Sequence, residues 1–305
     1  MEPSFSYDQD LINLLLSQLK LGKEKYDLTS LKYEYVDSEV AFEKSKDLIM
    51  SSEIISIDCE GDNLSRKGKL SVVQICTDNN EIFVLDYITL NDGLIKFLKL
   101  IMSNPKILKL GFDFRNDADI LLHQFGIEIE NLLDVQLVDF WKQTSLNLFS
   151  STLAEDWKES VKMGKIAWGD CFLPSLKSHS KEQMSKLKEI QKGDWTKRPL
   201  QENEIRYAAS DVMLIMHIFK EFEQQIIAEN LMDKFKNVSK KYCKMFAEKS
   251  VRKYDCWEAN QVTPIQVFSE MPYLKHCKLC CESVPVDMVY KASKICLRCH
   301  LKKLI

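Results

Sequence analysis

The stretch that decides the fold is Ile-Ser-Ile-Asp-Cys-Glu-Gly at residues 55–61, a short apolar run that ends in two carboxylates. Successive side chains of a strand point to opposite faces, so Asp58 and Glu60 share one face while Ile57 and Cys59 lie on the other. Two carboxylates on one face repel each other unless a cation lies between them. Taken alone, the pair is explained by a strand-end cap beside a solvated turn residue.

Strands and helices alternate on both sides of this stretch. Two β-rich runs follow it, and the Asp-Asn-Asn sequence at 78–80 that separates them predicts an antiparallel hairpin. Later strands are separated by helical patterns, which predicts helical crossovers. The fold class is therefore α/β, a mixed sheet flanked by helices. The expected strands are 32–36, 53–60, 69–77, 81–87, 106–112 and 132–137, and the expected helices are 38–51, 91–103, 116–126 and 199–230.

Length and composition are those of a compact globular protein. The chain has 305 residues, 45% of them hydrophobic and 29% charged, which leaves room for one domain of about 200 residues and smaller segments. Because we find no signal-peptide pattern and no membrane-spanning apolar run, we expect an intracellular protein, cytoplasmic in preference to nuclear, without a membrane partner. We divide the chain into a helical lead, a main domain, a basic helical extension and a cysteine-rich module, at residues 1–30, 31–230, 231–270 and 271–305.

Charge is distributed unevenly along the chain. The net charge is −3, yet residues 233–253 carry eight Lys/Arg against two acids, and residues 273–305 carry seven against two. Lys236, Lys240 and Lys244 repeat every fourth residue, so they share one face of a helix. Such a stripe could guide a nucleic-acid strand, and a merely solvated helix face is the alternative.

Three further residues change the interpretation of the first acidic pair. Asp117 lies near the start of the helix after a predicted strand, where α/β active sites gather, although the helix macrodipole alone would also favour an acid there. Tyr207 and Asp211 share one face of an otherwise apolar helix, where a mutual hydrogen bond is the alternative. Together Asp58, Glu60, Asp117 and Asp211 offer four oxygen donors suited to Mg²⁺ or Mn²⁺.

Four acids around two such ions describe a two-metal site for phosphoryl transfer. One ion would lower the pKa of a bound water, and the other would stabilise the leaving 3′-oxygen. Tyr207 would orient that water or help to deprotonate it. We therefore expect two Mg²⁺ or Mn²⁺ ions as active-site cofactors.

The same residues resemble the DEDDy group of 3′-to-5′ exonucleases, which includes ribonuclease D and the Werner-helicase exonuclease. Residues 57–61 are similar to the first motif of that group, residues 108–126 to the second, and Tyr-Ala-Ala-Ser-Asp at 207–211 to the third. The resemblance covers about residues 33–225. It implies a ribonuclease H-like fold and hydrolysis of single-stranded RNA in preference to DNA. It assigns the catalytic roles to Asp58, Glu60, Asp117, Tyr207 and Asp211.

Two longer stretches of sequence indicate which members of this group the chain resembles most. Residues 194–212, which begin Asp-Trp-Thr-Lys-Arg-Pro-Leu, are especially similar to ribonuclease D. Residues 58–77 are similar to exonuclease-domain proteins of the Egalitarian type, which are associated with germline RNA transport and small-RNA pathways. The second hypothesis is therefore an RNA-binding adaptor whose catalytic activity is dispensable. A third, a DNA-repair exonuclease of the Werner type, is disfavoured by the ribonuclease D-like block.

Three other acids in or after the second motif are not assigned as metal ligands. Asp117 is preferred to Asp113 and Asp119 because its spacing from the preceding strand matches the family. Asp134 resembles an acid that in this family supports the site without binding metal. No catalytic position departs from the family pattern.

The loop after the first motif supplies the candidate substrate contacts. Leu64 resembles the residue that wedges the terminal base in this family, and ordinary loop packing is the alternative. Arg66 and Lys67, together with Lys69, are candidate phosphate contacts, and a solvated hairpin edge explains them equally well.

The C-terminal segment carries a metal-binding pattern of its own. Cys277 and Cys280 form one C-x-x-C pair, and after 15 residues Cys296 and Cys299 form another. Two such pairs complete a tetrahedral S₄ site, so we expect one structural Zn²⁺ in a small zinc-binding module. The basic surplus there suits nucleic acid, and docking of a protein partner is equally allowed.

Overall fold

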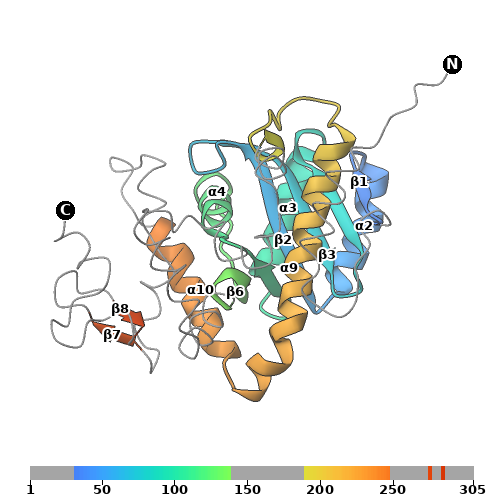
Figure 1. The fold of residues 1–305 in the computed structure, drawn as a ribbon. Helices are drawn as coiled ribbons and strands as arrows, with labels where there is room; N and C mark the ends of the chain where they lie inside the picture. The colour runs from blue at the N-terminus through green and yellow to red at the C-terminus, as the bar shows by residue number, and fades with distance from the viewer. Residues whose placement is uncertain (1–30, 139–188, 248–273, 277–282, 286–305) are drawn as a thin grey trace. The chain divides into compact units, whose positions relative to one another are not determined.

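The computed structural model describes residues 31–138, 189–247, 274–276 and 283–285 (Figure 1). These residues fall into two compact units. The first contains residues 31–135 and 189–230, and it holds all five residues assigned to catalysis. The second contains residues 136–138, residues 231–247 and two short strands.

The first unit is built on a six-stranded mixed sheet with the order β1-β4-β3-β2-β5-β6. β3 is antiparallel to both β2 and β4, whereas β5 is parallel to β2 and to β6, and β1 is parallel to β4. The predicted hairpin and helical crossovers are therefore confirmed. The strands are β1 (Glu34–Val36), β2 (Ile54–Asp62), β3 (Lys69–Thr77), β4 (Ile82–Asp86), β5 (Leu108–Gly111) and β6 (Leu132–Asp134).

The helices of this unit begin and end at residues suited to those positions. Ser38 caps α2 (Glu39–Ser51) by accepting from the N–H of Ala41, and Asp86 caps α3 (Tyr87–Ser103). α4 (Arg115–Phe125) ends at Gly126, whose left-handed φ of 63° costs little without a side chain. These bounds agree with the predicted helices within a few residues.

The long helix α9 (Glu202–Ala228) packs across the middle of the sheet, against β2, β3, β4 and β5 (Figure 1). Ile205, Ala208, Val212 and Ile215 are buried, as the helical spacing of the sequence predicts. α2 and α3 pack against β3 and against each other, with the rings of Phe42 and Phe97 in an edge-to-face contact. The core therefore lies between the sheet and these helices.

The second unit contains α10 (Met232–Ala247) and a small antiparallel pair, β7 (Leu274–His276) and β8 (Ser283–Pro285). α10 falls within the predicted basic extension, and Lys240 and Lys244 are exposed on it. The four predicted zinc cysteines, the N-terminal helical lead and residues 248–270 lie outside the described residues. Within the described ranges, every helix is too short or too polar to cross a bilayer.

Candidate active site

Three acids from two elements converge on one face of the sheet. One carboxylate oxygen each from Asp58, Glu60 and Asp211 can be chosen so that all three lie within 4.8 Å of one another. Asp58 and Glu60 project from β2 with the two-residue spacing that places them on one face, and Asp211 comes from α9. The structure thus brings together residues 150 positions apart, in an arrangement able to hold a divalent cation.

A hydrogen bond between the two elements fixes this arrangement. The hydroxyl of Ser56, on the same face of β2 as Asp58, donates to the carbonyl oxygen of Val212 at 2.6 Å. Ser56 is fully buried, and Val212 directly follows Asp211 in the chain. This hydrogen bond therefore fixes the position of α9 against β2 next to the acids.

Asp117 is the fourth acid that the sequence assigns to the site, and it lies outside the group of three whose oxygens converge. It lies in the first turn of α4, its side chain is buried, and its Oδ1 has no hydrogen-bond partner among the described residues. An unpaired buried carboxylate oxygen is costly, so it calls for a cation or a proton. Burial raises the pKa of Asp117 well above its usual range, and the charge of Asp58 raises it further.

Asp113 and Asp119, the two neighbouring acids not chosen as ligands, each form an ion pair with an arginine. Asp113 accepts from Arg115, with Nη2 and Oδ2 2.8 Å apart. The fully buried Asp119 accepts from Arg66, with Nη2 and Oδ1 2.6 Å apart. These pairings support the choice of Asp117 within the second motif.

Asp134 supports the site through the backbone, the role that the family resemblance implies. From the end of β6 it accepts from the N–H of Asp113 at 3.1 Å and from the N–H of Phe114 at 3.0 Å. These two residues form the turn between β5 and α4. Asp134 thereby fixes the start of the helix that carries Asp117.

Burial shifts the protonation of the whole cluster. It raises the pKa of Asp58 to about 7, and it raises the pKa values of Glu60, Asp117 and Asp211 well above their usual range. The negative charge of Asp58 adds to the effect at the other three carboxyls. Cations would reverse these shifts, because they stabilise the ionised forms. The residues present therefore fit Mg²⁺ or Mn²⁺.

Tyr207 lies beside this cluster, one helical turn before Asp211. Burial raises the pKa of Tyr207 well above its ordinary value, and the nearby carboxylates, Asp211 first, raise it further. The ring of Trp195 packs against it with the centroids 6.2 Å apart. The phenol is thus neutral and held at the edge of the acids.

Gln74 is a site residue that the sequence reasoning missed. From β3, directly opposite Asp58 in the ladder, its amide Nε2 donates to Asp58 Oδ2 at 2.7 Å. Its side chain is fully buried, and its Oε1 has no hydrogen-bond partner among the described residues. The signal that could have found it is a single amide inside the apolar run Val-Val-Gln-Ile-Cys at residues 72–76.

The loop between β2 and β3 is fixed to α4. Gln124 Nε2 donates to the carbonyl oxygens of Ser65, Arg66 and Gly68 at 3.3, 3.2 and 2.8 Å. The backbone N–H of Arg66 also donates to Asp119 at 2.7 Å. A side chain at Gly68 would collide with the loop backbone, because its Cβ would lie 2.0 Å from a carbonyl oxygen. The loop is therefore held in one conformation by α4, the helix that carries Asp117.

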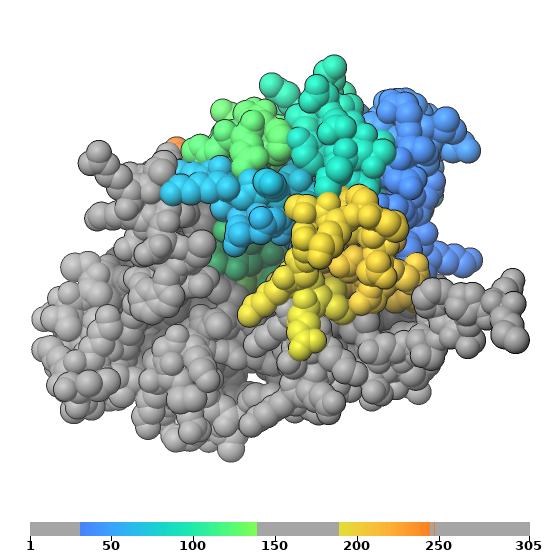
Figure 2. All heavy atoms as spheres, turned by 90° about the horizontal axis from the view of Figure 1, so that it is seen from above, coloured from blue at the N-terminus to red at the C-terminus, as the bar shows by residue number. Residues whose placement is uncertain are grey.

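The predicted substrate-binding side chains on this loop differ in whether they are exposed or already paired within the protein. Figure 2 views the face of the molecule on which the loop and the residues leading into α9 reach the surface. Leu64 is partly buried and Lys67 and Lys69 are exposed, so these side chains are accessible. The Arg66 guanidinium, in contrast, is paired with a fully buried carboxylate, which gives it a structural task in the loop.

The comparison of sequences settles the family to which this site belongs. The sequence model described as 3′-5′ exonuclease matches residues 33–227, which is more than half of the chain and contains every residue of the cluster. The chain belongs to the 3′-5′ exonuclease family. Residues 33–227 are accordingly called the exonuclease domain below.

Individual relatives agree with this assignment. Over 144 residues, 45% of this chain, the sequence is 31% identical to the piRNA biogenesis protein EXD1 of Mus musculus, and it covers 24% of that protein. Over 154 residues, 50% of this chain, it is 25% identical to a 3′-5′ exonuclease of Arabidopsis thaliana, and it covers 45% of it. The chain thus spans less than half the length of these relatives.

Solved structures show that the fold is shared as well. The crystal structure of Escherichia coli RNase D, titled an exoribonuclease involved in structured RNA processing, superimposes with a TM-score of 0.50 at 18% identity, over 72% of this chain and 52% of that one. Trypanosoma brucei RNase D, solved in complex with RNA, gives a TM-score of 0.52 at 19% identity, over 83% of this chain and 92% of that one. The exonuclease domain therefore has the mixed α/β fold of RNase D.

Proposed function

We propose that this protein is a metal-dependent exonuclease that removes nucleoside monophosphates from the 3′ end of single-stranded RNA. The observation that carries the proposal is the group of Asp58, Glu60 and Asp211, whose carboxylate oxygens converge, together with the buried, unpaired Oδ1 of Asp117 on α4, inside an exonuclease-family domain. Three carboxylates this close together are stable as anions only with a cation among them. Two divalent ions are the proposed occupants, and when bound they would activate a water and neutralise the leaving 3′-oxygen.

The chain's own residues contribute position and proton control. Asp58 and Glu60 from β2 and Asp211 from α9, whose carboxylate oxygens converge, would hold the ions together with Asp117 from α4. Tyr207 stays protonated near neutral pH, since burial and the carboxylates keep its pKa high. A neutral phenol can donate one hydrogen bond and accept another, so it would orient the attacking water in line with phosphorus.

RNA is proposed in preference to DNA on the strength of the relatives. Of the two RNase D structures that share the fold, one is of an exoribonuclease involved in structured RNA processing, and the other is a complex with RNA. The proposed contacts are Leu64 against the terminal base and Lys67 at the phosphates. The Lys236, Lys240 and Lys244 face of α10 is proposed separately as an RNA-binding surface. Arg66 is kept as a proposed phosphate contact to be tested against its structural role.

The test is a degradation assay on matched 5′-labelled RNA and DNA strands with Mg²⁺ or Mn²⁺. We expect the RNA to shorten stepwise from its 3′ end, and EDTA or Asp58→Ala to abolish the reaction. Glu53→Gln, a change of an exposed acid near the start of the same strand, is the matched control and should leave the rate unchanged. Strands that are bound normally but stay intact would exclude the proposal.

A second candidate function follows from the similarity to the piRNA biogenesis protein EXD1. In this proposal the exonuclease domain is an RNA-binding platform in a small-RNA complex, and a zinc module at residues 271–305 binds a protein partner. Asp117→Ala would then leave cellular function intact, and deletion of residues 271–305 would abolish it. The opposite pair of results would remove this candidate.

A further inference from the structure

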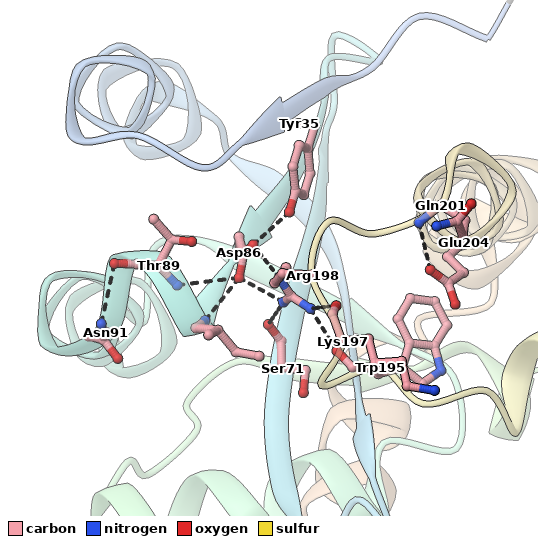
Figure 3. Close-up of polar contacts among 11 residues, drawn as sticks. Tyr35, Ser71, Asp86, Thr89, Asn91, Trp195, Lys197, Arg198, Gln201 and Glu204 are labelled. Carbon is pink, nitrogen blue, oxygen red and sulfur yellow. Dashed lines mark hydrogen bonds and ion pairs between the residues drawn. The ribbon is translucent and has the colours of Figure 1, made fainter.

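One arginine fixes the residues that lead into α9 to the sheet. Arg198 Nε donates to Asp86 Oδ2 at 2.6 Å, and its Nη2 donates to Oδ1 at 2.7 Å (Figure 3). Nη2 also donates to the carbonyl oxygen of Ser71 on β3 at 3.1 Å. Its Nη1 donates to the carbonyl oxygens of Trp195 and Lys197 at 2.8 and 2.7 Å. A planar guanidinium between a carboxylate and three carbonyls is held in a single orientation.

The carboxylate that receives this arginine is itself fixed. Asp86 Oδ2 accepts from the Tyr35 hydroxyl at 2.6 Å, and Oδ1 accepts from the N–H groups of Ile88 and Thr89 at 2.9 and 3.4 Å (Figure 3). Its side chain is 1% exposed. Although burial opposes ionisation, Arg198 and Tyr35 hold the pKa of Asp86 below its usual range. Asp86 is therefore an ionised and rigid partner at the junction of β4 and α3.

The other end of the contact chain is the phenol of the active site. Trp195, whose backbone carbonyl accepts from Arg198, is fully buried and packs its ring against Tyr207, with centroids 6.2 Å apart. The Trp195 indole N–H donates to the carbonyl oxygen of Gln191 at 3.2 Å, which fixes the ring orientation. Six residues after Trp195, Gln201 begins α9 in a capping box, in which its N–H donates to Glu204 at 2.7 Å. One continuous path thus joins Asp86 to Tyr207.

We propose that Asp86 and Arg198 are positioning residues for Tyr207. They fix the backbone of residues 195–201 so that the Trp195 ring holds the phenol beside Asp211. Neither residue belongs to the acidic cluster, so their effect on catalysis passes through the tyrosine. The inference rests on the proposed exonuclease function, in which Tyr207 orients the attacking water. A displacement of about 1 Å in such a group can cost roughly a hundredfold in rate.

The test is a double-mutant cycle on RNA degradation. Arg198→Lys retains the positive charge and loses the planar fork, and we expect it to lower kcat at least about tenfold while KM for RNA changes less than about twofold. In the Tyr207→Phe background the same substitution should lower kcat less than about twofold, because the hydroxyl that it positions is already absent. Asp86→Asn should show the same dependence on background.

Two further variants make the test decisive. Lys197→Gln removes a charge from the neighbouring position, whose side chain is 79% exposed, and should leave kcat unchanged in both backgrounds. Trp195→Phe probes the ring contact directly if the arginine variant fails to fold, and it should repeat the non-additive pattern. Thermal midpoints of all variants are measured in parallel, since a loss of folded protein would act equally in both backgrounds.

The possible results separate the two proposals. An active wild type with equal losses in both backgrounds, or with no loss at all, overturns the positioning role and leaves the exonuclease standing. A folded wild type that degrades neither RNA nor DNA overturns the proposed function and this inference together. A loss confined to the background that contains Tyr207 supports the inference.

Discussion

Gln74 donates a hydrogen bond to Asp58 across the β2–β3 ladder, with Nε2 and Oδ2 2.7 Å apart. Both residues are in strands, and the amide is fully buried. The bond engages one oxygen of the carboxylate and leaves the other for a cation. It also lowers the pKa of Asp58 against the larger opposing effect of burial. Gln74 therefore orients Asp58, and it would act on a bound cation through that carboxylate.

We expect Gln74→Met to raise the Mg²⁺ concentration needed for half-maximal activity. A hydrogen bond to a charged group contributes about 1.5–3 kcal/mol, so the midpoint should rise roughly tenfold or more. A metal titration of the rate at saturating RNA measures this directly. Ile75→Val, a change at the next residue of β3, should leave the midpoint where it is. An unchanged midpoint for Gln74→Met would show that burial alone orients Asp58.

Stability in the absence of metal should fall as the pH rises. The folded-state pKa of Asp58 is about 7 against an ordinary value of 3.8, so the native state binds the extra proton between these limits. The stability that this group contributes is complete below about pH 4 and is lost as the pH rises through about 7. Glu60, Asp117 and Asp211 are shifted in the same direction. In EDTA, the temperature of half-unfolding should therefore decrease as the pH is raised from 5 to 8.

A divalent cation should oppose that loss. Because it stabilises the ionised carboxylates, Mn²⁺ should raise the thermal midpoint more at pH 8 than at pH 5. Asp58→Asn should reduce both the pH dependence and the response to Mn²⁺. A midpoint that responds equally to Mn²⁺ at the two pH values would place the ion elsewhere on the chain.

Arg66 and Lys67 should separate into a structural and a substrate-binding residue. Among the described residues, Arg66→Met leaves the fully buried Asp119 with His123 as its basic neighbour, Nε2 and Oδ1 being 3.7 Å apart. Loss of one partner of a buried pair typically costs about 3–5 kcal/mol, so chemical denaturation should show a large decrease in the free energy of unfolding. Lys67→Met should leave that free energy unchanged and raise KM for RNA. The reverse pattern would make Arg66 the phosphate contact.

The lysine face of α10 should appear in the salt dependence of RNA binding. Replacing Lys236, Lys240 and Lys244 by Gln removes three charges, which should flatten the slope of log K against log salt by about 2 for single-stranded RNA. The control is the same triple change at three exposed lysines of α3 and the turn after it. These are Lys96, Lys99 and Lys106. Equal slopes for both triple variants would mean that the α10 face is merely solvated.

The sequence by itself determined the main strands and helices and the faces on which the first and third motifs present their acids. Period-two alternation around Asp58 and period-3.6 burial around Tyr207 depend only on neighbouring residues, and they predicted β2, α9 and the faces on which these side chains lie. The choice of Asp117 over Asp113 and Asp119 came from resemblance to a family. In the structure, the arginine pairs of the two rejected acids support that choice.

Only the tertiary structure decided which residues far apart in the sequence pair with one another around the site. Gln74 faces Asp58 because of the antiparallel register, and Arg198 reaches Asp86 across more than a hundred residues of sequence. Arg66 looked like a free cation in the sequence, and its carboxylate partner lies on α4. Local patterns contain no information on such pairings, because strand register and helix docking are fixed by packing of the whole core.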